Sequence, residues 1–390
     1  MLFLRELPEV DLHKKKNALY AIYAMSLLTS IGFGAFGIVL SLYMWSLGIS
    51  FSGLGSAFSM FGISMAAAGL IFGAHSDVVG RRRYLVLSLI LDSVIMFLYT
   101  QANALTHFMV LEGLGGISAS LRSVIVPALI TDLTREKERG GRFGGIGGFG
   151  WIGTGLGYLA GGLFSGLVNF FWVFVVISLL DIVSCLLVIL FVSPYRVAKK
   201  ESFRLISFKG LTPQMRVWLA ISFVSALASV PVEVIVIPVY LVEFLGVDRA
   251  VFGAFMASSY LALSLTQFLG GNMADKYDRG LIFSVSQVAS AFFIALQPMF
   301  PFFPCFATLY FLEGLGEGLS MPSRNALSAS SVRPEHRGLD FSLLNLAGNV
   351  GSVVGSLGIG ILLETVSFDY SFYIRALTYL VVALLVHIQK

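Results

Sequence analysis

Six ionisable side chains interrupt long apolar stretches of this 390-residue chain. Charged groups are costly in an apolar medium, so those that occur there usually serve a function. Carboxylates in such positions can carry protons, and arginines can bind anions or balance the carboxylates. The six residues are Glu112, Arg122, Glu233, Glu313, Glu317 and Arg324.

Helical spacing brings three of the six onto one face. At ~100° per residue, Glu313 and Glu317 lie about 40° apart, and Arg324 falls about 20° from Glu313. Two carboxylates one turn apart cannot both be ionised cheaply in a low dielectric. We therefore expect Glu313 or Glu317 to bind and release a proton that is coupled to the protein's function, with Arg122 or Arg324 as the electrostatic partner of that carboxylate. The alternative is that these groups form pairs within or between bundles of helices and only stabilise packing.

The composition indicates the medium that surrounds these groups. Hydrophobic residues make up 57% of the chain and charged residues only 12%, whereas soluble domains carry about 25% charged residues. A soluble fold of this length could not cover so much apolar surface. The chain is therefore expected to be an integral membrane protein in contact with a lipid bilayer.

A helix needs ~20 apolar residues to cross a bilayer, and charged or turn-rich breaks divide the sequence into twelve such runs. The third and ninth runs are the short ones. The runs are 18–46, 51–74, 84–101, 105–131, 143–166, 170–192, 216–244, 249–272, 281–299, 303–330, 339–363 and 370–389.

If the twelve runs cross the membrane in turn, lysines and arginines are unevenly distributed between its two sides. Twenty-two of the 26 fall on the side that carries both ends of the chain. Such a bias marks the cytoplasmic side, so both termini are expected in the cytoplasm, with the protein in the plasma (inner) membrane. The net charge of +4 then reflects topology, and no nucleic-acid partner is expected.

Other kinds of site find no support in the sequence. The two cysteines, Cys185 and Cys305, lie in apolar runs without metal-ligand spacing, and the five histidines are scattered. Neither a disulfide framework nor a metal site is therefore expected. The sequence shows no nucleophile clustered with a base and no phosphate-binding loop, so we expect neither an enzyme nor a bound cofactor.

The two halves of the chain repeat one another. Leu111–Gly115 and Leu312–Gly316 share the sequence Leu-Glu-Gly-Leu-Gly. A second match relates Gly73, Asp77 and Arg81 to Gly271, Asp275 and Arg279, 198 positions later. We interpret these matches as a duplication; the alternative is chance similarity between glycine-rich helices. The expected domains are a six-helix bundle at 1–192, a cytoplasmic linker at 193–215 and a second six-helix bundle at 216–390.

The loop between the second and third runs identifies a family. Its residues resemble the major facilitator superfamily signature G-x-x-x-D-x-x-G-R-R/K at every fixed position. They are Gly73, Asp77, Gly80, Arg81 and Arg82. With twelve runs and a central break, the resemblance covers the whole chain. It implies an all-α membrane protein with twelve transmembrane helices in two pseudo-symmetric six-helix bundles.

The same loop is expected to take part in gating. Gly80 permits a tight turn with positive φ. The family's usual arrangement implies that Asp77 meets the start of span 11, and that Arg81 meets an acidic residue ending span 4, for which Asp132 is the candidate. Such contacts would hold the cytoplasmic side closed; the alternative is a basic loop that only fixes topology. The corresponding residues of the second half are Asp275 and Arg279.

Span 5 resembles the motif of the exporting, antiporter branch of the superfamily, G-x8-G-x3-G-P-x2-G-G. This chain has tyrosine where the family has proline. Glycines at every fourth position form a smooth stripe that lets helices approach closely. The resemblance implies export, and ordinary small-residue packing is the alternative. The motif residues are Gly144, Gly153, Gly157, Tyr158, Gly161 and Gly162.

In the family's fold, spans 1, 4, 7 and 10 line a central cavity, which would place all six ionisable residues there. Pro231 and Pro238 flank Glu233 and should bend span 7. Asp92 on span 3 is expected to be peripheral, and Arg375 is placed near the outer start of span 12, without a role. A pocket rich in aromatic side chains and poor in amides suits a lipophilic or amphipathic molecule better than a sugar.

These features favour a monomeric secondary active transporter that works by alternating access. The leading interpretation is proton-coupled efflux of a small organic molecule. One alternative is uptake or exchange of a metabolite or organic anion attracted by Arg122 and Arg324. An alternative of another class is a transporter-like membrane receptor or sensor.

Overall fold

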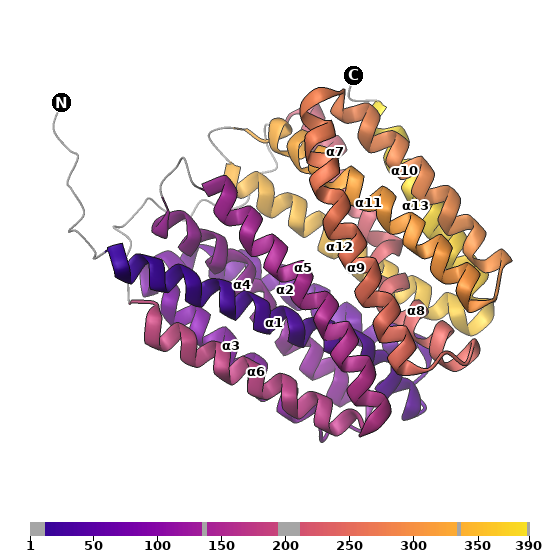
Figure 1. The fold of residues 1–390 in the computed structure, drawn as a ribbon, viewed down its shortest axis with the longest axis horizontal. Helices are drawn as coiled ribbons and strands as arrows, with labels where there is room; N and C mark the ends of the chain where they lie inside the picture. The colour runs from indigo at the N-terminus through magenta and orange to yellow at the C-terminus, as the bar shows by residue number, and fades with distance from the viewer. Residues whose placement is uncertain (1–11, 135–138, 194–210, 334–336, 388–390) are drawn as a thin grey trace.

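The computed structural model describes residues 12–134, 139–193, 211–333 and 337–387. Within these ranges the side chains of residues 12–14, 70, 72–79, 131–132, 139–145, 268, 275 and 337–339 lie outside the description. All the regular elements in the described part of the chain are helices (Figure 1).

Six helices form the first half: α1 Leu12–Ser46, α2 Phe51–Val79, α3 Arg81–Tyr99, α4 Leu105–Leu133, α5 Arg139–Leu167 and α6 Phe170–Phe191. The second half begins with a composite rod of four segments: α7 Pro213–Pro231, η2 Val232–Val236, α8 Ile237–Val239 and η3 Tyr240–Phe244. It continues with α9 Arg249–Lys276, α10 Arg279–Leu296 extended by η4 Gln297–Met299, α11 Phe303–Ser331, α12 Arg337–Thr365 and α13 Asp369–His387.

Each predicted apolar run coincides with one of these rods, so the predicted all-α fold is confirmed. Nine of the described helices are long and apolar enough to cross a membrane by length and composition. The other three are less apolar for visible reasons. Helix α3 begins with three arginines, α5 is rich in glycine, and α11 carries three of the ionisable residues singled out above.

Polar residues begin several of the helices. The side chains of Asn169, Thr212, Asp248 and Asp278 accept hydrogen bonds from backbone N–H groups in the first turns of α6, α7, α9 and α10. These caps satisfy donors that have no partner within the helix. Helix α3 begins directly after Gly80, whose φ of 106° confirms the predicted glycine turn.

The two halves use the same helix pairings. In the first half α1 packs on α5 and α6, α4 packs on α2 and α3, and α3 packs on α6. In the second half α7 packs on α12 and α13, α11 packs on α9 and α10, and α10 packs on α13. Each pairing in one half has its counterpart in the other, as a duplicated six-helix unit predicts. The exact domain boundaries stay a prediction.

Two helix pairs make the most extensive contacts between the halves: α2 packs on α12, and α5 packs on α9. Glycines allow the backbones to meet directly. A Cβ on Gly55 of α2 would overlap the carbonyl oxygen of Ser356 in α12. A Cβ on Gly162 of α5 would lie 2.9 Å from the Cα of Gly253 in α9. The two pairs are counterparts under the same duplication.

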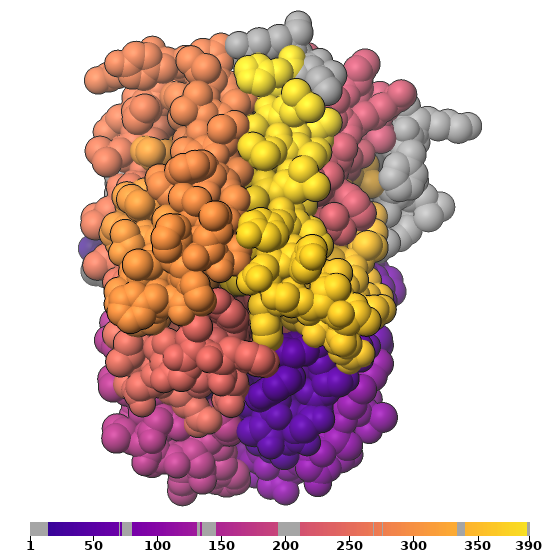
Figure 2. Space-filling model, turned by 90° about the vertical axis from the view of Figure 1, so that its right-hand side faces the viewer, coloured from indigo at the N-terminus to yellow at the C-terminus, as the bar shows by residue number. Residues whose placement is uncertain are grey.

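Contacts between the halves are dense at the end that carries the turns near residues 48 and 367, which we call the sealed end. Ring centroids lie 4.5 Å apart for Trp45 and Phe51 within the first half, and 4.5 Å apart for Phe244 and Phe368 within the second; Trp45 lies 6.3 Å from Phe244 across the two halves. The two pairs meet because Phe51 also packs edge-on against Phe368 at 5.4 Å. Figure 2 shows this end, where segments near residue 50 and segments near residue 360 form one continuous surface.

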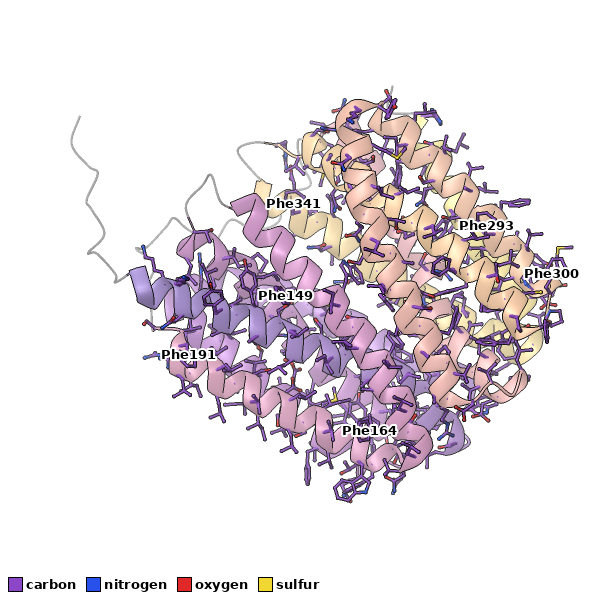
Figure 3. All side chains as sticks on the ribbon, in the orientation of Figure 1. Phe149, Phe164, Phe191, Phe293, Phe300 and Phe341 are labelled. Carbon is purple, nitrogen blue, oxygen red and sulfur yellow. The ribbon has the colours of Figure 1, made fainter. Side chains whose placement is uncertain are left out.

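The outer surface of the molecule is apolar. Large hydrophobic side chains stand exposed along the described helices, and five of the phenylalanines labelled in Figure 3 belong to this surface. They are Phe149, Phe164, Phe191, Phe300 and Phe341. Exposed apolar rows of this extent fit lipid better than water.

The predicted glycine stripe of span 5 faces α1. A Cβ added at Gly157 would overlap the carbonyl oxygen of Ile31, and one at Gly161 would lie 2.7 Å from the Cα of Ala35. On the same helix, Gly147 has open space where a Cβ would stand. The stripe therefore serves helix packing within the first half.

Gly157→Ala is expected to destabilise the protein by about 1–3 kcal/mol, because the added methyl group must push α5 away from α1. Gly147→Ala is the control and should be neutral or slightly stabilising, since alanine favours helices over glycine. Thermal unfolding of the two variants in detergent measures the difference. Equal melting temperatures would contradict the close packing of α5 on α1.

Candidate substrate cavity

A cavity of about 260 Å³ lies mainly inside the second half. Its walls come from α7, η2, α9, α10, α11 and α13, and α5 of the first half contributes Trp151. Four of the six predicted ionisable residues line it: Glu233, Glu313, Glu317 and Arg324. Helical spacing predicts that Glu313, Glu317 and Arg324 form one polar stripe, and all three line the cavity from α11.

Glu313 is buried and fully engaged. Its Oε1 forms an ion pair with Nη2 of Arg375 at 2.7 Å, and its Oε2 accepts a hydrogen bond from Nε2 of Gln297 at 2.8 Å. The exposed fractions of Glu313 and Arg375 are 3% and 4%. Burial without such partners would be prohibitive for either charge.

Arg375 lies near the start of α13, as predicted for span 12, but sequence analysis assigned it no role. It lines the cavity and reaches α11. A usable signal was present in the sequence, because the residue falls within the apolar run 370–389. Arginine inside such a run requires a partner, and the sequence does not say which carboxylate supplies it.

Glu317 has a neutral partner. Nε2 of Gln287 in α10 donates to Oε2 of Glu317 at 3.1 Å and lies 3.2 Å from the hydroxyl of Ser320. Glu317 is only partly buried and lines the cavity. A carboxyl that faces a cavity beside a neutral amide can exist in either protonation state without breaking an ion pair.

Glu233 connects the cavity to the first half of the protein. Tyr260 of α9 donates from its hydroxyl to Oε1 of Glu233 at 2.6 Å. The Tyr260 ring stacks between two rings of α5, those of Trp151 at 5.7 Å and Tyr158 at 5.2 Å. The tyrosine that replaces the family's proline in span 5 is therefore an element of the contact between halves.

The rod that carries Glu233 departs from α-helical geometry. Glu233 lies in η2, a π-helical segment between Pro231 and Pro238, and π-helical segments are frequent at functional sites. Pro238 has no N–H to offer the carbonyl four residues before it, that of Val234. The hydroxyl of Ser41 in α1 donates to this carbonyl, which adds a bond between the halves.

Glu112 and Arg122 are not among the residues that line the cavity. Glu112 is buried within the first half, where the hydroxyl of Tyr99 donates to its Oε1 at 2.7 Å. Arg122 forms an ion pair with Asp92 of α3, the residue that sequence reasoning regarded as peripheral. The structure thus assigns these two a pairing inside one bundle, which was the alternative considered for them.

The arginines of the predicted gating loop bind helix ends of the first half. Nη1 of Arg81 donates to the carbonyl of Ala128 in α4 at 2.8 Å, and Nη2 of Arg82 donates to that of Ile189 in α6 at 2.5 Å. In the second copy, Nε of Arg279 donates to the carbonyl of Ala274 at 3.1 Å. The remaining predicted residues lie outside the residues whose side chains are described: Gly73, Asp77, Asp132, Gly144 and Asp275.

The described residues contain no group of three or more histidine, cysteine, aspartate or glutamate side chains arranged to hold a metal ion. The polar groups of the cavity are instead bound by tyrosine, glutamine and arginine. The arrangement suits reversible binding of protons and of a partly apolar molecule.

The sequence matches the family model for the Major Facilitator Superfamily over residues 22–240 and 217–388. The chain belongs to the Major Facilitator Superfamily. Membership, together with the fold, makes it a multi-pass membrane transporter of small molecules and not an enzyme.

Among curated relatives of this superfamily member, the multidrug resistance protein MdtH of Salmonella paratyphi B and that of Salmonella newport are each 35% identical over 135 residues. The match covers 32% of this chain and 31% of each relative, so it spans about a third of their length.

Solved structures share the fold over nearly the whole chain. The nucleoside transporter NupG is 16% identical with a TM-score of 0.74, and 95% of this chain and 98% of that chain are covered. The human organic anion transporter MFSD10 is 14% identical with a TM-score of 0.69 and coverage of 95% and 99%. At this level of identity the likeness concerns the fold alone.

Arg375→Gln should lower the free energy of unfolding by about 3–5 kcal/mol, because it leaves Glu313 buried without a cation. The double variant Arg375→Gln/Glu313→Gln should recover most of this loss. Arg216→Gln, at an exposed position near the start of α7, controls for loss of an arginine. Denaturant titration in detergent micelles measures all three; a double variant as unstable as Arg375→Gln would contradict a buried ion pair.

Proposed function

We propose that this superfamily member is a proton-coupled exporter of small amphipathic organic molecules. The observation that carries the proposal is the grouping of three carboxylates and two arginines around one aromatic-walled cavity. Charge of this density inside a membrane protein is expensive unless transport uses it. The glycine pattern of α5 and the partial similarity to a multidrug resistance protein support the direction of export.

Glu317 is the proposed proton carrier. Glu313 is held as a carboxylate by Arg375, so its protonation would leave a buried cation unmatched. Glu317 has only a neutral amide and a cavity beside it. It can therefore exchange a proton for a substrate group at lower cost than Glu313.

Alternating access would work by opening the sealed end while the opposite end closes. The aromatic contacts of Trp45, Phe51, Phe244 and Phe368 support a gate between the halves at that end. Placing the lysine- and arginine-rich loops in the cytoplasm makes the sealed end the outer one. The cavity would then belong to the inward-facing stage of the cycle, in the plasma membrane, with both termini cytoplasmic.

The walls of the cavity support an amphipathic substrate. Trp151, Tyr260, Tyr310 and Phe283 offer aromatic surface, and Met321 offers an adaptable apolar contact. A few polar groups among apolar walls are typical of sites for small organic molecules.

A second candidate function is uptake or exchange of an organic anion, which the two cavity arginines favour. Proton-driven export predicts substrate-dependent proton movement in proteoliposomes. Anion exchange predicts saturable counterflow that does not respond to a pH gradient. A receptor would bind its ligand without net flux.

Glu317→Gln should reduce pH-gradient-driven transport at least tenfold, because the variant side chain cannot carry a proton. Counterflow exchange of the same substrate, selected by a thermal-shift screen of the purified protein, should persist. Glu243→Gln, at an exposed position of η3, is the matched control and should transport normally. Unchanged pH-driven accumulation by Glu317→Gln would refute its role as the proton carrier.

Asp77→Asn tests the proposed gating loop. Loss of the negative charge should slow transport severalfold, because the loop could no longer stabilise the closed inner side. Transport and the amount of protein in the membrane are measured separately, so that failed insertion is not mistaken for failed gating. Normal transport kinetics at normal membrane levels would remove the gating role.

A further inference from the structure

Arg375 has more hydrogen-bonding capacity than its ion pair uses. A guanidinium carries five N–H donors, and Nη2 is the nitrogen that contacts Glu313. The Nε and Nη1 atoms are buried and have no hydrogen-bond partner among the described residues. The side chain is 4% exposed, and it forms part of the cavity wall. Buried donors in this state are costly.

The neighbours of Arg375 do not supply acceptors for Nε and Nη1 in this structure. Both oxygens of Glu313 are engaged, one with Arg375 and the other with Gln297. Tyr379 presents its ring to the guanidinium, with 5.9 Å from Cζ to the ring centroid. A ring face offers an electrostatic contact and no strong acceptor.

The groups in the cavity wall that lack hydrogen-bond partners among the described residues are mainly the N–H donors of its arginines. Each cavity carboxylate already accepts a hydrogen bond: Glu233 from Tyr260, Glu313 from Gln297 and Glu317 from Gln287. Among the described residues, Arg324 has no ion-pair or hydrogen-bond partner, and it also lines the cavity. Other buried oxygens in the described part of the chain also lack a hydrogen-bond partner, among them Oε1 of Gln297 and the hydroxyls of Ser323 and Ser356, but these residues are not part of the cavity wall.

The two arginines occupy different depths. At ~1.5 Å per residue, Arg324 lies about 16 Å along α11 from Glu313. Arg324 is partly exposed and can bind water, whereas Arg375 is buried at the level of Glu313. Arg375 is therefore the arginine whose donors need a ligand, and the rings of Tyr310 and Tyr379 stand beside it in the wall.

We propose that Arg375 is a substrate-binding residue that anchors the carboxylate of an amphipathic aromatic acid. The proposal rests on the proposed transport function and names the substrate class of the same cavity. Glu313 acts as a positioning residue, because it fixes one nitrogen of the guanidinium and leaves the others for the ligand. The apolar body of the acid packs against Tyr310 and the aromatic rings toward α5. Guanidinium and carboxylate form strong charge-assisted hydrogen bonds.

The test compares three probes with one ring system and different head groups: 1-naphthylacetate, its methyl ester, and 1-naphthylmethylamine. Binding to the purified full-length protein is measured by calorimetry. The acid should bind at least tenfold more tightly than the ester. Equal affinities, tighter binding of the amine, or no saturable binding of the acid would each overturn the proposal.

The variant for this test is Arg375→Gln/Glu313→Gln, because it avoids a buried unpaired carboxylate. It should weaken acid binding at least tenfold and change ester binding less than twofold. A merely structural role would alter both probes together and would leave their ratio unchanged, which would also overturn the proposal. Arg375→Lys keeps the charge but has fewer donors in a different geometry, and it should give an intermediate affinity. The matched control, Arg216→Gln, should bind all probes as the unmodified protein does.

Equilibrium binding separates this inference from the proposed function. If the acid binds through Arg375 but no pH gradient drives its movement, proton-coupled export fails while the carboxylate site stands. If a pH gradient drives transport of a different compound and the acid does not bind, the carboxylate site fails while the transport function stands.

Discussion

A charge held between transmembrane helices must find its partner inside the protein, because lipid offers none. This constraint decides where the polar side chains of this transporter can lie. Glu313 takes Arg375 and Gln297, and Arg122 takes Asp92. The helices that carry these groups are thereby fixed in pairs, α11 with α13 and α4 with α3. Polar side chains that still have unpaired donors or acceptors after this pairing are the ones available to bind protons and substrate.

The duplicated halves satisfy the constraint differently. Glu112 and Glu313 occupy the same Leu-Glu-Gly-Leu-Gly context, yet Glu112 meets the hydroxyl of Tyr99, while Glu313 meets a cation. The backbone pairings of the two halves remain parallel. Divergence of a few side chains on a shared scaffold has therefore concentrated the polar cavity in the second half. An aromatic connection through Tyr158 and Tyr260 keeps that cavity in contact with the first half.

Local patterns in the sequence predict the fold well, and they predict the site only in part. Hydrophobic run length locates the helices because the bilayer imposes a minimum length, and the glycine turn at Gly80 follows from its conformational freedom. Helical spacing places Glu313, Glu317 and Arg324 on one stripe. It does not reveal that Arg122 turns toward Asp92 or that Arg375 reaches α11, because partner choice depends on how separate helices are rotated against one another. The π-helical segments η2 and η3 could not be predicted either, because a search for the regular α-helical period does not distinguish them from α-helix.

The hydrogen bond between Ser41 and the carbonyl of Val234 makes the attachment of α1 to the second half depend on the proline at position 238. Pro238 lies between the two π-helical segments and, because it lacks an N–H, leaves the carbonyl of Val234 free to accept a hydrogen bond from the opposite half. Replacing this proline would restore the N–H and so weaken the attachment of α1 to the second half. Residues 41 and 238 should therefore change together over evolutionary time, although they lie in different halves and do not touch through their side chains.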